Sequence, residues 1–265
     1  MDANHAPEGV ITVITPTRRR PHLIGRAIES VANQCCRHVD EHVVVVDDCP
    51  STWSWLGREL PPFVRPRFVA RGPREVGGPT RAAKLRDIGT SIARTRWVAY
   101  LDDDNEWESN HLHSLLSEAI ESACPAVYSW TQVFHRDGTP YLDEVNPWSH
   151  DLDSGLAEYA RLRRAGVVTA GSHIYRDRLD PFDGEDAVRS VDQSAWLLET
   201  ELVKRITFSN MPMRPNREEG LAEDDVFNLN LVAEGIRARS TELATLRYYL
   251  GGYSTAPEQN EPADW

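Results

Sequence analysis

The stretch WVAYLDDDN, residues 97–105, decides the fold that this sequence predicts. It begins with an apolar run, Trp97 to Leu101, and continues directly into three consecutive acids, Asp102 to Asp104. A short apolar run bounded by polar residues is typical of a strand buried in a sheet. Ligands of open α/β sheets bind beyond the carboxyl ends of the strands, which is where the three carboxylates lie.

Three adjacent carboxylates are a costly arrangement, because like charges oppose one another's ionisation. Asp102, Asp103 and Asp104 therefore indicate a positive group between them. Mg²⁺ and Mn²⁺ prefer oxygen ligands and bridge carboxylates to phosphate groups. The run predicts either a divalent cation site or a solvated acidic loop, and its place after a buried strand leaves the two about equally supported.

Strand and helix patterns alternate before this run. Val10 to Ile14 predicts a first buried strand, which the loop Thr15-Pro16-Thr17 closes. Apolar residues recur at helical spacing from Leu23 to Val31, and Val43 to Val46 predicts a second buried strand. A strand, a helix and a strand in this order predict a parallel βαβ unit with a right-handed crossover.

The alternation continues through the first half of the chain. Arg67 to Ala70 predicts a third strand, and a helix is predicted from Thr80 to Arg94. A further helix and strand follow the acids, over Ser109 to Ser122 and Ala126 to Val133. The fold class predicted is therefore α/β, with a central, mostly parallel sheet flanked by helices.

The second half is less regular. The elements predicted there are a loop over Asp137 to Gly155, a strand over Val167 to Tyr175, a helix over Gln193 to Lys204, a loop over Met211 to Gly220 and a helix over Asp224 to Glu234. We found no linker between the halves, so we expect a single domain over residues 1–265, ending in a polar tail at 253–265. The two loops are our candidates for acceptor contacts and a closing lid.

Composition excludes several classes of protein. The formal net charge of -12 and a pI of about 5.2 argue against a nucleic-acid partner. There is no apolar run long enough for a membrane span, and the polar start, Met1 to Gly9, does not resemble a secretory signal, so we expect a cytoplasmic protein.

Cysteine and histidine spacing indicates no metal site. The four cysteines, at positions 35, 36, 49 and 124, form no Cys-x-x-Cys pair, which argues against both a zinc knuckle and a disulfide framework. His111 and His113 are two residues apart in a predicted helix, where such residues do not share a face.

Two further acidic pairs come at the ends of predicted elements. Asp47 and Asp48 follow the second strand, where an acid can accept hydrogen bonds from a base or a ribose, or cap a turn. Glu223 and Asp224 begin a late helix, whose dipole favours ionised carboxylates, so helix capping is the ordinary alternative to a chemical role.

Together these motifs resemble glycosyltransferase family 2, whose members have the GT-A fold. The segments that carry the resemblance, in chain order, are residues 11–19, Val45 to Asp48, Arg86 with Gly89 and Ala93, Trp97 to Asn105, and Glu223 to Phe227. The resemblance implies a donor half over about 10–108 and an acceptor half over about 109–252.

The resemblance also implies a role for each matching residue. These roles are the nucleotide pocket for Thr15, Pro16 and Thr17, the base for Asp48, the diphosphate for Arg86, ribose or phosphate for Asp102 and Asp103, the metal for Asp104 with Asp102, and the general base for Asp224 with Glu223 as the next candidate. The cofactor expected is Mn²⁺ or Mg²⁺.

The chemistry implied is transfer of a sugar from a nucleotide-diphosphate sugar to an acceptor hydroxyl, with inversion. A divalent ion stabilises the diphosphate leaving group, and a carboxylate takes the acceptor's proton. We expect a small soluble acceptor. Two departures from the family pattern bear on the nucleotide contacts: Asp87 replaces an expected asparagine, and Cys49-Pro50 replaces an expected Gly-Ser.

Two other functions remain open. A sugar-phosphate nucleotidyltransferase needs a glycine-rich loop after the first strand, and residues 15–20 contain no glycine. A non-catalytic nucleotide-sugar binding module has no use for a general base. A dinucleotide-dependent oxidoreductase is excluded, because no Gly-x-Gly-x-x-Gly follows a strand.

Overall fold

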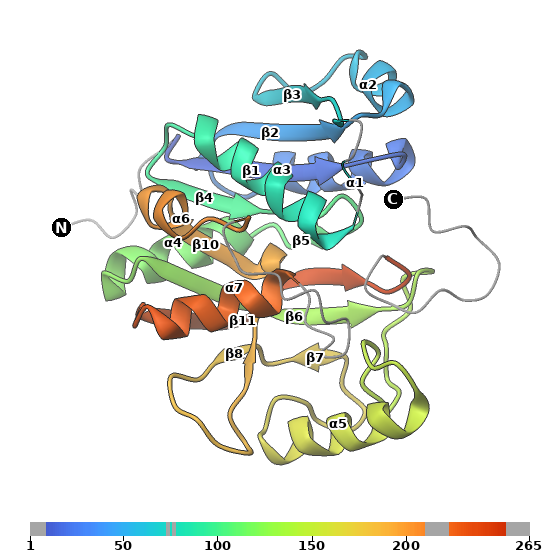
Figure 1. Cartoon of the computed structure of the whole chain (residues 1–265), viewed down its shortest axis with the longest axis vertical. Coiled ribbons are helices and arrows are strands. Elements are labelled where there is room, and N and C mark those ends of the chain that lie inside the picture. The colour runs from blue at the N-terminus through green and yellow to red at the C-terminus, as the bar shows by residue number, and fades with distance from the viewer. Residues whose placement is uncertain (1–8, 73–74, 76–77, 210–222, 253–265) are drawn as a thin grey trace.

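The computed structural model describes residues 9–72, 75, 78–209 and 223–252 (Figure 1). The strands are β1 (Ile11–Thr17), β2 (Val39–Asp47), β3 (Val64–Val69), β4 (Trp97–Tyr100), β5 (Glu106–Trp107), β6 (Ala126–Phe134), β7 (Ile174–Tyr175), β8 (Arg178–Leu179), β9 (Arg189–Ser190), β10 (Trp196–Glu199) and β11 (Ala238–Tyr249). The helices are α1 (Pro21–Ala32), α2 (Pro50–Leu56), α3 (Pro79–Ile92), α4 (His111–Ser122), α5 (Leu152–Arg164), the 3₁₀ turn η1 (Gln193–Ala195), α6 (Thr200–Ile206) and α7 (Glu223–Ala233).

One sheet takes strands from both halves of the chain. Within the described residues its order is β3-β2-β1-β4-β10-β6-β11-β5, and β7 pairs with β6 beside that path. Figure 1 shows α3 and α7 in front of this sheet and α1 behind it, while α5 lies beyond its lower edge. The predicted α/β class, a mostly parallel sheet flanked by helices, is confirmed.

The predicted parallel half is also confirmed. β1 pairs in parallel with β2 on one side and with β4 on the other, and β2 pairs in parallel with β3. Because these strands run in one direction, their carboxyl ends meet at one edge of the sheet. The acids at the ends of β2 and β4 therefore lie along the same edge.

The loop predicted over Thr15-Pro16-Thr17 is wrong, because these residues continue β1. Thr17 pairs with Val46 in the register of β2, and all seven residues of β1 are buried. The Thr15 hydroxyl lies 2.8 Å from Nε2 of His42, inside the sheet. Burial among these strands lowers the pKa of His42 to about 3.

The single helix predicted over Gln193 to Lys204 is wrong. The segment instead forms η1, the antiparallel strand β10 and helix α6. β10 lies between β4 and β6, where Trp196, Leu197 and Leu198 are fully buried. A run this short has no periodicity that separates a central strand from a buried helical turn, so the sequence pattern alone could not identify it.

Three more elements differ from the predictions. The loop predicted over Asp137 to Gly155 ends in helix α5, which begins at an Asp151–Ser154 capping box. The predicted strand over Val167 to Tyr175 is reduced to β7. β11 was not predicted at all, because shifts of register between Ser240 and Leu246 interrupt its pairing and break the alternation along the strand.

Helix α3 packs closely on the first strand. A Cβ atom at Gly89 would lie 2.5 Å from Cγ2 of Ile14, so no larger residue fits there without a shift of β1 or α3. This close approach brings the arginines of α3 to the edge where β2 and β4 end, as the ion pairs of Arg81 and Arg86 demonstrate.

Candidate active site

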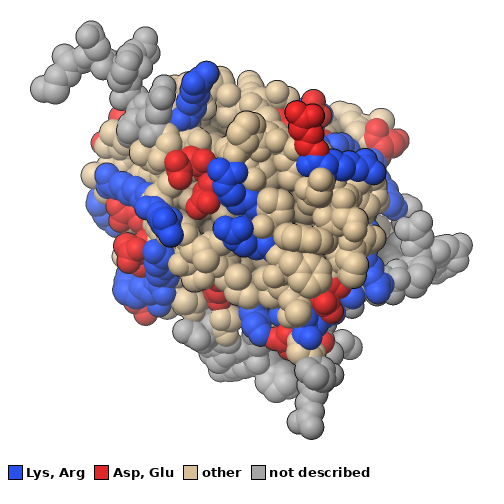
Figure 2. Space-filling model, turned by 90° about the horizontal axis from the view of Figure 1, so that it is seen from above, with Lys and Arg blue, Asp and Glu red and all other residues tan. Residues whose placement is uncertain are grey.

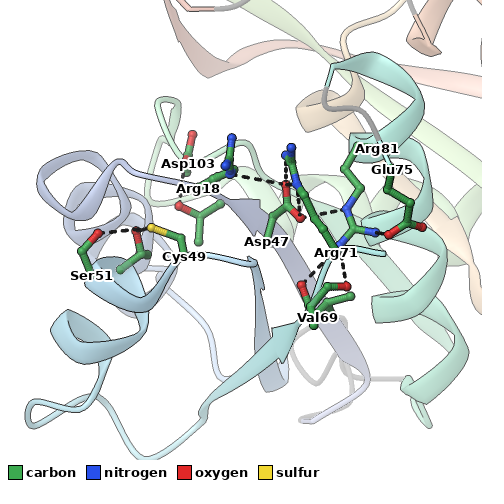
Figure 3. A network of polar contacts seen from close by, with 12 residues as sticks. Arg18, Asp47, Cys49, Ser51, Val69, Arg71, Glu75, Arg81 and Asp103 are labelled. Atoms are coloured by element: carbon green, nitrogen blue, oxygen red, sulfur yellow. Dashed lines mark hydrogen bonds and ion pairs between the residues drawn. The ribbon is translucent and has the colours of Figure 1, made fainter. Parts of the chain in front are cut away.

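The acid at the end of β2 is Asp47, which is fully buried among arginines (Figure 3). Arg81 Nε donates to Asp47 Oδ1 at 2.8 Å, and Arg71 donates to both oxygens of the carboxylate. Arg18 Nε lies 3.9 Å from Oδ2. Burial opposes ionisation, but the hydrogen bonds from Arg71 and Arg81 outweigh it and hold the pKa of Asp47 below its usual range. We call Asp47, Arg18, Arg71 and Arg81 the arginine-rich network.

Asp48, the expected base contact, begins the turn that follows. Its backbone is left-handed, with φ of 43°, a conformation that aspartate tolerates better than most residues. Its amide donates to Val69 O, and its charge adds to that of Asp47 in raising the pKa of Arg71. The unexpected Pro50 stands at the first position of α2, where its missing N–H costs no hydrogen bond.

The surface at the end of the molecule formed by β3 and α2 carries both positive and negative side chains (Figure 2). Figure 2 views the end of the sheet that carries β3 and α2, and acidic and basic side chains are interspersed on it. The net charge of -12 therefore does not form one continuous acidic field on this face.

The acids after β4 are held by a different arginine. Arg20 NH1 lies 3.2 Å from Asp103 Oδ1 and 2.7 Å from Asp104 Oδ2, and the Thr17 hydroxyl donates to Asp103 Oδ2 at 2.7 Å. Burial, followed by the charge of Asp104, raises the pKa of Asp103 to about 7 despite Arg20 and Thr17. Burial likewise raises the pKa of Asp104, with Asp102 adding to the effect and Arg20 opposing it.

Arg86 joins the acids after β4 to the acids that begin α7, and Glu223 lies 137 positions after Arg86 in the chain. Its NH2 group donates to Asp102 Oδ1 at 2.6 Å, and NH1 donates to Glu223 Oε1 at 2.9 Å. The Arg86 side chain is only 4% exposed, so the guanidinium itself is shielded from water. Burial lowers the pKa of this guanidinium, but Asp102 and Glu223 raise it further, so Arg86 remains a cation.

Asp224 and Asp192 complete the group. Burial, then the charges of Asp225, Glu223 and Asp192, raise the pKa of Asp224 well above the usual value. Burial and the charge of Asp102 raise the pKa of Asp192 to about 7. We call this set the acidic cluster, and its members are Asp102, Asp103, Asp104, Asp192, Glu223 and Asp224.

Asp192 was missed by the sequence analysis. Its carboxylate accepts the Ser194 amide at 2.7 Å, and it stands before a segment predicted as a helix, so in sequence it is indistinguishable from an N-cap. Its place near Asp102 depends on η1 and β10, which sequence periodicity did not find. Arg20 belongs to a visible basic run, Arg18 to Arg20, but nothing in the sequence paired it with the acids.

Asp87, the departure from the family's asparagine, points away from this cluster. Its two oxygens accept the amides of Phe208 and Ser209, both at 2.7 Å. The carboxylate therefore holds the turn after α6 to α3. Each carboxylate oxygen accepts one amide, whereas an asparagine in this position would turn its donor NH₂ group toward one of the two N–H groups.

The end of the described chain lies against Asp104. A Cβ atom at Gly252 would lie 2.6 Å from Asp104 Oδ2. The Tyr249 amide donates to Asn105 Oδ1 at 3.2 Å, which anchors the end of β11 beside the loop after β4. The lid candidate, Met211 to Gly220, lies outside the described residues.

The acidic cluster fits a divalent cation. Asp102 and Asp104 offer carboxylate oxygens, and their side chains are 30% and 18% exposed, so an ion can reach them from solvent. Burial first, and then the charges of neighbouring carboxylates, raise the pKa values of Asp103 and Asp104 even though Arg20 opposes the shift. Oxygen donors with surplus negative charge are what Mg²⁺ and Mn²⁺ prefer.

The comparisons with known proteins agree with this geometry. The family model described as Glycosyl transferase family 2 matches residues 12–180, which is more than half of the chain. The chain belongs to this family. The matched region contains the arginine-rich network and the acids after β4, whereas Asp192, Glu223 and Asp224 lie beyond it.

Three curated relatives support the assignment. TuaG of Bacillus subtilis, whose name refers to teichuronic acid biosynthesis, is 27% identical over 131 residues, or 49% of this chain and 50% of that protein. WcaA of Escherichia coli, named for colanic acid biosynthesis, is 29% identical over 41% of this chain and 37% of its own length. The succinoglycan biosynthesis protein ExoO of Rhizobium meliloti is 30% identical over 48% of this chain and 35% of its own length. The matches thus span half or less of these relatives.

Solved structures share the fold. S. aureus TarS 1-349 in complex with UDP-GlcNAc aligns with a TM-score of 0.55 at 15% identity, over 90% of this chain and 58% of that one. The mannosyltransferase PcManGT of Pyrobaculum calidifontis, with GDP-Man and Mn²⁺, aligns with a TM-score of 0.55 at 16% identity, over 98% and 60%. The expected GT-A fold is confirmed.

Proposed function

We propose that this chain is a nucleotide-sugar glycosyltransferase that uses a divalent cation and inverts the configuration of the transferred sugar. The donor binds along the edge where β2 and β4 end, and the donor and acceptor halves are residues 10–108 and 109–252. The observation that carries the proposal is the double ion pair of Arg86 with Asp102 and Glu223. Through it the guanidinium of Arg86 holds together Asp102, from the donor half, and Glu223, from the acceptor half.

The arginine-rich network and the acidic cluster would bind different parts of the donor. The arginine-rich network and Asp48 lie at the end of β2, where they would receive the nucleoside, as expected for Asp48. Thr17 and Arg20 orient Asp103 and Asp104, and Asp102 with Asp104 would hold Mn²⁺ or Mg²⁺. When bound, that ion neutralises charge on the diphosphate leaving group. Thr15 and Pro16 act from within β1, by shaping the strand that leads to Thr17.

Asp224 is the proposed general base. The acids around it raise its pKa, and a carboxylate with a raised pKa accepts a proton more readily from an acceptor hydroxyl. Glu223, one residue earlier, is held by Arg86 and is the alternative base. One base without a partnered general acid fits a single displacement with inversion.

The acceptor in this proposal presents a sugar hydroxyl. The sequence favoured a small soluble compound, whereas the names of TuaG and ExoO refer to the biosynthesis of teichuronic acid and of succinoglycan. Those names belong to the relatives, and a panel of free sugars against lipid-linked sugars separates the two kinds of acceptor.

The deciding experiment is a thermal-shift screen of the protein with UDP, GDP, dTDP, CDP and ADP, each with Mn²⁺, Mg²⁺ or EDTA. A diphosphate at about 100 times its Kd should stabilise the fold by about 2.7 kcal/mol. We expect one nucleotide to stabilise only with metal. Asp104→Ala should remove that shift, while Asp143→Ala, which changes an exposed acid, should keep it.

Turnover assays complete the test. Release of nucleoside diphosphate on incubation with the matching nucleotide sugar supports the proposal. Release of pyrophosphate on incubation with a nucleoside triphosphate and a sugar 1-phosphate would instead support a nucleotidyltransferase. Donor binding that is unaffected by EDTA would remove the metal from the mechanism.

A further inference from the structure

Three potential metal ligands converge at the opposite edge of the sheet. Cys36 Sγ lies 3.6 Å from His113 Nδ1, and His38 Nε2 lies 3.3 Å from the same nitrogen. These three atoms all lie within 4.8 Å of one another. Cys35 Sγ is a further 3.6 Å from Cys36 Sγ, and all four cysteines of the chain are free thiols.

The separations match the edges of a zinc tetrahedron. Zinc binds imidazole nitrogen at about 2.0–2.1 Å and thiolate sulfur at about 2.3 Å. For tetrahedral angles those bond lengths place two nitrogens about 3.3 Å apart and a sulfur about 3.6 Å from a nitrogen. The His38–His113 and Cys36–His113 distances therefore equal two edges of such a site, and the Cys36–His38 separation is within 4.8 Å. The two imidazole rings are nearly parallel, with centroids 5.6 Å apart, so binding one ion requires the exposed His113 ring to turn.

The backbone holds the ligands in place without a metal. The Cys35 amide donates to Ser109 O at 2.7 Å, and the Gln34 side chain donates to Glu108 O and accepts the Leu112 amide, both at 2.9 Å. These bonds fix the loop between α1 and β2 to the start of α4, which carries His113.

His38 is fixed from its other side. Its carbonyl accepts the amides of Val10 and Ile11 at 2.9 and 3.0 Å, which ties it to the first residues of β1. His38 is 3% exposed, whereas His113 is exposed to solvent. An ion can therefore enter from the His113 side and reach a position that the chain has already arranged.

The sequence predicted no metal site at His111 and His113, because residues two apart do not share a helix face, and the two side chains do lie on different faces of α4. His111 is buried, with Nδ1 2.8 Å from the Thr245 hydroxyl, while His113 faces the α1–β2 loop. The partners of His113 come instead from residues 75 and 77 positions earlier. Spacing along the chain carries no sign of such a group.

We propose that Cys36, His38 and His113 bind one Zn²⁺, with Cys35 or a water molecule in the fourth position. The nine residues of β2 separate His38 from Asp47, so the site lies about 30 Å from the arginine-rich network. It belongs to the fold and not to the transfer reaction. Because its ligands come from separate elements, zinc binds the folded chain and stabilises it.

The test uses the full chain, purified under reducing conditions, and titrated with Co²⁺ and then with Zn²⁺. We expect one equivalent of Co²⁺ to give the absorption of a tetrahedral site together with a sulfur-to-cobalt charge-transfer band, and Zn²⁺ to displace it. A metal held by Asp102 and Asp104 has only oxygen ligands and gives no sulfur band. The spectrum therefore distinguishes this proposal from the donor-site metal, and either can fail alone.

Variants assign the ligands. His113→Ala, at an exposed position, and the double variant Cys35→Ser/Cys36→Ser should each weaken Co²⁺ binding by at least about 100-fold, since losing even a group behind a ligand costs 10–100-fold. His150→Ala, which removes another exposed histidine, should bind as the original chain does. Zinc should raise the melting temperature of the original chain and of His150→Ala, and leave that of His113→Ala unchanged.

Two results would overturn the proposal. One is a reduced chain with native circular dichroism that shows no sulfur-to-cobalt band at any Co²⁺ concentration. The other is a folded His113→Ala variant that binds Co²⁺ as tightly as the original chain. In either case the contacts among the three side chains are hydrogen bonds and bind no ion.

Discussion

The arginine-rich network and the acidic cluster lie along one edge of the sheet but have opposite charge balance. Around Asp47, three guanidiniums converge on one buried carboxylate, and its pKa is lowered. In the acidic cluster, six carboxylates share Arg20 and Arg86, and the pKa values of Asp103, Asp104, Asp192 and Asp224 are raised. A surplus of arginine suits an anionic ligand, and a surplus of carboxylate suits a cation. The two regions together match a metal nucleotide.

The largest effect on turnover should come from a change in the acidic cluster. Asp224→Asn removes the proposed base but keeps the shape of the side chain, so turnover should fall by about 10²–10⁴-fold. Donor binding should change little, because Asp224 is not a proposed donor contact. Steady-state kinetics and thermal shifts with donor measure the two quantities separately. Turnover that is unchanged would remove Asp224 from the mechanism and leave Glu223 as the candidate.

The second prediction contrasts the two regions directly. Asp47→Asn removes the fully buried carboxylate from Arg81 and leaves it only the partly exposed Glu75, and breaking a buried ion pair costs about 3–5 kcal/mol of unfolding free energy. Asp103→Asn should cost much less, because burial and the acids around Asp103 already oppose its charge. Urea denaturation of both variants without metal measures the difference. Equal losses would mean that the two charge balances do not differ in energy.

A third prediction concerns Asp87, the acid of α3 that belongs to neither region. Asp87→Ala leaves two amides of the turn after α6 without acceptors, so stability should fall by about 1–3 kcal/mol. The KM for donor should not change. A raised KM at unaltered stability would instead place this carboxylate at the diphosphate.

The fourth prediction separates acid sensitivity from both carboxylate regions. Burial lowers the pKa of His111 to about 3 from 6.5 in the unfolded chain. Unfolding therefore takes up a proton between those values, and stability is lost as pH falls below 6.5, by about 1.4 kcal/mol per pH unit for this group. His111→Asn should reduce the slope of unfolding free energy against pH by that amount between about pH 4.5 and 6.

The control for the pH experiment is His150→Asn, which changes an exposed histidine. Its slope should equal that of the original chain, as measured by urea denaturation across the same pH interval. A slope that His111→Asn does not alter would show that its imidazole is protonated in the folded state, contrary to the expected effect of burial.

The parallel half of the fold was predictable because the residues of each strand or helix themselves carry the pattern of that element. Val43 to Val46 and Trp97 to Leu101 are apolar runs that end in acids, and both form central strands. β10 and β11 were not predictable in this way. β10 is a strand only because β4 and β6 lie on either side of it, and β11 has an interrupted register.

The candidate active site likewise has residues that the sequence indicated and contacts that it did not. The sequence indicated the acids of both motifs and Arg86, which the structure brings together through two ion pairs. It could not pair Arg20 with Asp104, or bring Asp192 near Asp102, because those contacts depend on turns and on the position of β10. It also placed Thr15 in a pocket, although Thr15 contacts His42 within the sheet.

The position of β10 has a consequence for synthesis of the protein. β4 is complete at Tyr100, but the strand that covers its outer edge begins only at Trp196. Nearly 100 residues must leave the ribosome in between, which takes roughly 5–20 s at usual elongation rates. During that interval the nascent sheet exposes an apolar, unpaired strand edge, a surface on which chains aggregate. Slow translation of this interval, or a chaperone that covers β4, should therefore govern the yield of folded protein more than the stability of its finished state.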